Sequence, residues 1–96
     1  MYGLIGKFTS TEGKRDELIG YLLEGLQDMP GCLSYVVAKA PEDEVTIWVT
    51  EVWDTSESHL ASLQLPQVQA AIAKARPMIA GMERLAETDV QGGVGI

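Results

Sequence analysis

The chain has 96 residues, of which 46% are hydrophobic and 22% are charged, and its formal net charge is −7. This length and composition predict one globular domain spanning residues 1–96. The seven basic residues are scattered, which argues against a nucleic-acid partner, because binding to phosphates needs clustered Lys and Arg. Cys32 is the only cysteine, so neither an intrachain disulfide nor a multi-cysteine metal site can form.

The beginning of the sequence, Met1 to Lys7, lacks the basic segment that precedes the long apolar stretch of a signal peptide. No apolar run approaches the roughly 18 residues needed to cross a bilayer. A single cysteine also fits a reducing compartment. We therefore expect a cytoplasmic protein that has no membrane partner.

The first third of the chain predicts a strand followed by an amphipathic helix. The apolar run from Tyr2 to Phe8 is typical of a strand, and the polar residues 9–11 that follow it are typical of a helix cap. Leucines then recur at every fourth position and form one apolar stripe, at Leu18, Leu22 and Leu26. Pro30 and Gly31 are expected to end this helix.

The middle of the chain predicts a hairpin and a second helix. Two β-rich runs, 33–40 and 45–53, are joined by the short polar loop 41–44 and should pair antiparallel. Asp54 followed by Glu57 resembles a capping box, so we expect a helix from Asp54 to about Gln64.

The last third predicts one more helix and a weak strand. Pro66 suits the first turn of a helix, which Pro77 and then Gly81 should end. Its apolar face would comprise Val68, Ala71, Ile72 and Ala75. Residues 82–90 are expected to form a weak strand, and the glycine-rich residues 92–95 a flexible tail.

The predicted order is strand, helix, strand, strand, helix, strand, which is the ferredoxin-like α+β plan with the helices on one face of an antiparallel sheet. Alternation in the second and third strands puts apolar side chains on both faces. Ile47 and Val49 point to one side, whereas Trp48 and Val52 point to the other. The face without helices would be apolar and uncovered in a single chain, so we expect a homodimer in which the sheets of two copies pack against each other.

In order and spacing, several short motifs resemble the antibiotic biosynthesis monooxygenase family, with its quinol monooxygenase branch. They are Gly13-Lys14 with Glu17-Leu18, Pro30-Gly31-Cys32-Leu33-Ser34-Tyr35, Glu51-Val52-Trp53, Ser56-Glu57-Ser58-His59, and the closing Gly92-Gly93-Val94-Gly95-Ile96. This resemblance covers nearly the whole chain. It implies a dimeric α+β barrel and an oxygenase that needs no metal, flavin or other cofactor.

The resemblance implies a quinol-like or polycyclic phenolic substrate whose deprotonated form passes electrons to O₂. We expect His59 and Trp53 to be the catalytic residues, because the end of a strand and the first helical turn after it should meet at the mouth of a cleft. An imidazole titrates near neutrality and is a better base than an ordinary carboxylate. Structural roles remain open, since a buried tryptophan packs and a histidine at a helix border can simply hydrogen-bond.

Three further residues are candidates for binding the substrate. Trp48 and Tyr35 are expected either to line the same cleft or to fill the dimer interface. Glu51 falls on the Trp53 side of its strand, where it would orient a substrate hydroxyl, pair with Arg84 or be solvated.

Composition weighs against the haem-degrading branch of the family. Those relatives use an asparagine in the first strand, and this sequence has no asparagine; the segment 68–76 also lacks the histidine that would bind haem iron. One His and one Cys without further ligands do not predict a tetrahedral metal site. Two functions remain: a cofactor-independent monooxygenase, or a dimeric protein that binds a small ligand or is associated with stress without turnover.

Overall fold

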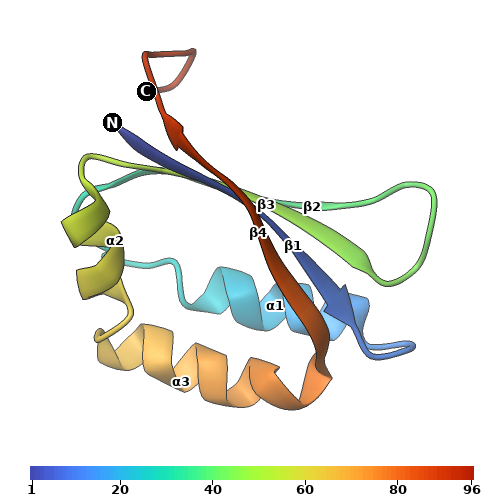
Figure 1. Cartoon of the computed structure of the whole chain (residues 1–96). Helices are drawn as coiled ribbons and strands as arrows, with labels where there is room; N and C mark the ends of the chain where they lie inside the picture. Colours follow the sequence, from blue (N-terminus) through green and yellow to red (C-terminus); the bar gives the residue numbers. More distant parts are fainter.

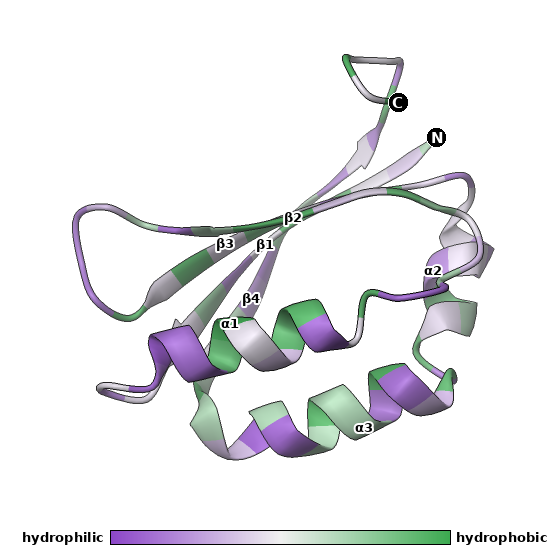
Figure 2. Ribbon diagram, turned by 180° about the vertical axis from the view of Figure 1, so that it is seen from behind, coloured by the Kyte–Doolittle hydropathy of each residue, from purple (hydrophilic) through white to green (hydrophobic).

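The computed structural model describes residues 1–96 and contains one antiparallel sheet with the strand order β2-β3-β1-β4 (Figure 1). The strands are β1 (Tyr2–Ser10), β2 (Cys32–Lys39), β3 (Thr46–Trp53) and β4 (Ile79–Asp89). β1 is central and pairs antiparallel with both β3 and β4. The hydrophilic loop that follows β2 leads directly into β3, so the predicted hairpin is confirmed (Figure 2).

The helices leave one face of the sheet free. α1 (Arg15–Glu24) and α3 (Pro66–Ala75) lie side by side against the other face, and the short α2 (Ser56–Ser62) lies at one end of the sheet (Figure 1). A 3₁₀ turn, Arg76–Met78, links α3 to β4. The predicted ferredoxin-like α+β fold is thus confirmed. None of the helices has the length and apolar character of a membrane span.

The core lies between the sheet and the two long helices. Leu18 of α1 and Ile47 of β3 are fully buried, and Val49 and Ala75 complete the central cluster. Ile47 and Val49 are two positions apart on one strand, so alternation turns both toward the helices. Leu18 belongs to the predicted leucine stripe, so the apolar side of the helix and the apolar side of the strand pack together in one core.

The opposite face of the sheet carries apolar side chains that no helix covers. Val36 is 52% exposed, Trp48 38% and Ile5 37%. Trp48 lies between the buried Ile47 and Val49 on β3, so alternation turns it to the uncovered face. Val36 pairs with Thr50, two residues after Trp48, and therefore lies on the same face. The ammonium group of Lys7 lies 6.0 Å from the centre of the Trp48 ring. The prediction that both faces are apolar is confirmed.

Three predicted helix boundaries are wrong. α1 ends at Glu24, and turns fill the stretch before Pro30, where the sequence pattern predicts its end. The N-cap of α2 is Thr55, whose hydroxyl accepts a hydrogen bond from the Ser58 N–H at 3.2 Å; Asp54 lies one residue too early. Thr55 has the extended backbone that an N-cap requires, and its side chain accepts from one of the free N–H groups of the first helical turn. Gly81 lies inside β4 and ends no helix, because the chain is already extended from Ile79 onward after the turn at Pro77.

Candidate active site

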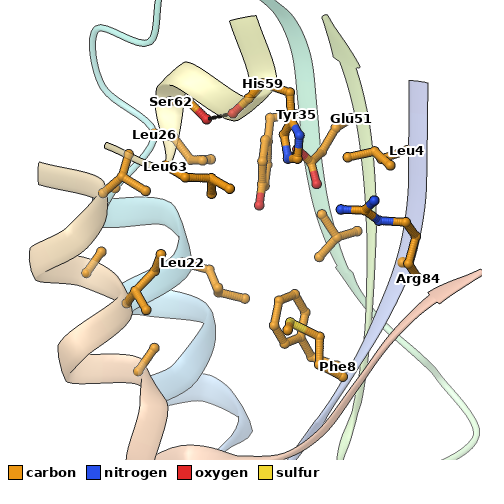
Figure 3. Close-up of a pocket in the computed structure, with 18 of the residues that line it drawn as sticks. Leu4, Phe8, Leu22, Leu26, Tyr35, Glu51, His59, Ser62, Leu63 and Arg84 are labelled. Atoms are coloured by element: carbon orange, nitrogen blue, oxygen red, sulfur yellow. Dashed lines mark hydrogen bonds and ion pairs between the residues drawn. The ribbon is translucent and has the colours of Figure 1, made fainter. Parts of the chain in front are cut away.

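A cavity of about 650 Å³ lies between the sheet and the helices. All three helices and all four strands contribute to its wall, which is mainly hydrophobic. Figure 3 shows Phe8 at one end of the cavity, with Leu22, Leu26 and Leu63 along the side formed by the helical layer. This size and lining suit a small organic molecule, since ligand pockets are usually 300–1,000 Å³ and mostly apolar.

The other end of the cavity is polar. His59 Nε2 lies 3.7 Å from Glu51 Oε1, and the two side chains are only 10% and 15% exposed. The Trp53 indole N–H donates a hydrogen bond of 3.0 Å to the same Glu51 oxygen. Arg84 extends toward this end from β4, but its guanidinium pairs with Glu87 at 3.1 Å (Figure 3). Glu51 therefore meets His59 and Trp53 rather than solvent or a direct ion pair with Arg84.

The local sequence explains why these three side chains meet. Glu51 and Trp53 are two residues apart on β3, so alternation turns both toward the helices. α2 begins just after β3, which places His59 beside Trp53 with a ring-centre distance of 5.5 Å and an edge-on geometry. On its other side the imidazole meets the Tyr2 ring at 6.0 Å.

Burial controls the protonation of Glu51. Loss of hydration raises the pKa of this carboxyl above its ordinary value, and this effect outweighs the hydrogen bond from Trp53 and the charges of His59 and Arg84, which lower it. Glu51 thus holds a proton more readily than a surface glutamate. A carboxyl with a raised pKa beside an imidazole in a cavity is characteristic of sites that move protons.

The raised pKa of Glu51 predicts a specific dependence of stability on pH. The folded state binds the Glu51 proton more tightly than the unfolded state, so the associated stabilisation is present below the ordinary pKa of 4.5 and is lost as pH rises through the folded pKa. The Glu51→Gln variant should lack this part of the decline. Denaturant unfolding of both proteins from about pH 4.5 to 7 measures it.

The other carboxyl groups with shifted pKa values change stability at lower pH than Glu51 does. The pKa values of three aspartates are lowered by hydrogen bonds, so their effects on stability appear below about pH 3.8; they are Asp16, Asp43 and Asp54. Glu42→Gln, a change in the exposed loop after β2, is the matched control and should keep the pH slope of the parent. An equal slope in Glu51→Gln and the parent would contradict the raised pKa.

The structure brings together four of the five predicted site residues. His59, Trp53, Tyr35 and Glu51 all line the cavity, whereas Trp48 projects from the uncovered face and does not line it. The prediction that Trp48 lines the cleft is therefore wrong, and its alternative place in a dimer interface stays a prediction. Among the described residues, no three His, Cys, Asp or Glu side chains gather as metal ligands.

Sequence reasoning did not identify the contribution of β4 to the cavity. Met82 and Arg84 both line it, and Met82 is 68% exposed at its edge. β4 has a register shift where Ile5 pairs with Ala86 and the next residue, Gly6, pairs with Arg84. This bulge interrupts simple alternation, so the sequence pattern alone did not indicate from which face of the sheet the Arg84 side chain projects.

The fold and the cavity define a ferredoxin-like α+β protein with a mainly hydrophobic site between its sheet and its helices. The model of the family described as antibiotic biosynthesis monooxygenase matches residues 1–74. The chain therefore belongs to the antibiotic biosynthesis monooxygenase family. A comparison with curated proteins gave no match.

Solved structures support this assignment. A protein of the same family name from Chloroflexus aurantiacus J-10-fl is 60% identical, with 99% of this chain and 97% of that chain covered and a TM-score of 0.94. A structure from Deinococcus radiodurans is 20% identical, covers 100% of this chain and 98% of its own, and has a TM-score of 0.78. At that identity the second structure supports the fold alone.

Proposed function

We propose that this chain is a monooxygenase that binds a quinol-like or polycyclic phenol in the cavity and reacts it with O₂ without metal or flavin. The supporting observation is the contact of Glu51 with His59 at one end of a mainly hydrophobic cavity. The apolar wall would hold the planar ring away from water, while the phenolic hydroxyl would lie at the polar end. Membership of the monooxygenase family supports the same reaction class.

His59 is proposed as the base that accepts the phenolic proton. Glu51, 3.7 Å from His59 Nε2, would stabilise the resulting imidazolium, and the Trp53 N–H would hold the Glu51 carboxylate in place. Trp53 is a positioning residue in this scheme. The ionised phenol is richer in electrons than the neutral one and is the form that reacts with O₂.

The reaction balances without an added reductant. With a hydroquinone, one atom of O₂ enters the ring as a hydroxyl group and the other leaves as water. The product is a hydroxyquinone, and the four electrons taken up by O₂ all come from the ring. The protein therefore has to supply only a dry cavity, an oriented ring and a proton acceptor.

Oxygen consumption with a panel of hydroquinones tests the proposal. We expect the rate to exceed uncatalysed autoxidation and to saturate with substrate concentration. The heat-unfolded protein is the control for trace metals, which would survive heating. Saturable binding with no increase in rate would contradict the enzyme and would identify a protein that binds small aromatic ligands without turnover.

We further propose that a second copy of the chain covers the free face of the sheet. Val36, Trp48 and Ile5 are exposed there, and an uncovered apolar face is typical of an interface. A two-fold pairing would bury the same side chains of both copies. Trp48 is the largest apolar group on this face, and large aromatic side chains contribute most to binding at interfaces.

Trp48→Glu should raise the dissociation constant of the homodimer about a hundredfold, because it replaces a buried aromatic ring by two unpaired charges in the assembled dimer. Sedimentation equilibrium across micromolar concentrations measures the constant. Leu60→Glu is the matched control, since Leu60 is 61% exposed but lies on α2. A parent protein that sediments as a monomer would rule out this interface.

A further inference from the structure

Tyr35 contributes a polar group to the cavity that the proton-transfer scheme does not use. The side chain reaches from β2 into the cavity, and its hydroxyl points away from His59 toward the open centre (Figure 3). The residue is mostly buried, and no group of the chain hydrogen-bonds to this hydroxyl. The only side-chain oxygen or nitrogen that is both fully enclosed and without a hydrogen-bond partner is Ser10 Oγ. The unpartnered Tyr35 hydroxyl is therefore not fully enclosed and borders accessible space in the cavity.

The surroundings of Tyr35 keep it a hydrogen-bond donor. Burial, followed by the charge of Glu51, raises the pKa of the Tyr35 phenol well above its ordinary value, so the hydroxyl stays protonated at neutral pH. A phenol donates one hydrogen bond through its O–H group. The side chains along the helical side of the cavity, such as Leu22, Leu26 and Leu63, offer no acceptor. Glu51 pairs with Tyr35 across the strands, but its carboxyl group makes no hydrogen bond with the Tyr35 hydroxyl.

We propose that Tyr35 is a specificity-determining residue that donates a hydrogen bond to a carbonyl oxygen of the bound ligand. The cavity then distinguishes phenols that also carry a ring ketone from the same phenols without it. This inference rests on the proposed function, because it places the phenolic hydroxyl of the ligand near Glu51 and His59. Tyr35 adds a second polar contact, separate from the proton acceptor, and so fixes which way round the ring binds.

Two probes with the same bicyclic skeleton test the role of Tyr35. 5-Hydroxy-1-tetralone and 5,6,7,8-tetrahydro-1-naphthol share one phenol group and differ by a ketone in place of a methylene. We expect calorimetric titration at neutral pH to show that the parent binds the ketone roughly five- to tenfold more tightly, the scale of one hydrogen bond. Tyr35→Phe should remove this preference and leave the dissociation constant of the tetrahydronaphthol within about twofold.

Tyr21→Phe is the matched control. Tyr21 also lines the cavity, but its ring lies under the ammonium group of Lys74 on the helical side, so the variant should keep the preference of the parent. Equal binding of both probes to the parent, or a preference that survives in Tyr35→Phe, would overturn the inference and leave the proposed function standing. Binding of neither probe would overturn both, since a phenol-binding cavity is their common premise.

Discussion

Oxygen uptake by the His59→Ala variant is expected to be about a hundredfold slower than that of the parent, the scale of losing a general base. The imidazole is the proposed proton acceptor next to Glu51, and alanine has no group that accepts a proton. The comparison uses a hydroquinone that the parent turns over, at saturating concentration. Circular dichroism of each variant establishes that it is folded.

Ser62→Ala is the control for the His59 variant. Ser62 is as buried as His59, lies on the same helix and lines the same cavity, but its hydroxyl donates only to the His59 carbonyl at 2.6 Å. This variant should keep turnover within about threefold, since a neutral hydrogen bond contributes little to stability and none to proton transfer. Full turnover in folded His59→Ala would remove the histidine from the mechanism.

Trp53→Ala is expected to lower the free energy of unfolding by roughly 3 to 5 kcal/mol, the usual cost of deleting a fully buried large aromatic ring. Trp53 is 1% exposed and packs edge-on against His59 at the end of β3. Its loss also leaves Glu51 without its N–H donor. Denaturant unfolding measures the change, and a loss below about 1 kcal/mol would show that the ring is not a packing centre.

Trp53→Phe separates the packing of the indole from its hydrogen bond. Phenylalanine keeps most of the buried ring but lacks the N–H group, so the variant should lose less stability than Trp53→Ala. Its turnover should still fall, because Glu51 is no longer held toward His59. Unchanged turnover in Trp53→Phe would mean that packing alone explains the tryptophan.

The parts of the site that the sequence predicted correctly depend on short-range geometry. Glu51 and Trp53 fall on one side of a strand because side chains alternate, and His59 meets Trp53 because a helix begins within three residues of that strand. These relations hold whatever the rest of the fold does. They therefore predicted that Glu51 and His59 both lie on the side of Trp53, but not that Glu51 and His59 contact each other.

The parts that the sequence left undecided depend on pairing between distant segments. Trp48 could be assigned to the cavity or to the other face only when the register of β3 against its neighbours was known. Arg84 reaches the cavity because of a bulge, which is a product of pairing between β4 and β1. The cap of α2 illustrates a local competition, since Asp54 and Thr55 are both good N-cap residues and the backbone decides between them.

The pairing of the first strand with the last has a consequence for how the molecule folds. Tyr2 pairs with Asp89, and the Val90 N–H donates to the Met1 carbonyl at 2.9 Å, so a long loop must close before the sheet is complete. Contacts so distant in sequence slow folding, because the entropy of loop closure is lost before the pairing stabilises the chain. During synthesis, β1 can pair with β4 only after residues 79–89 have been made, so the part of the cavity wall that carries Met82 and Arg84 forms last. A nascent chain that has completed the β2–β3 hairpin therefore still lacks the finished cavity.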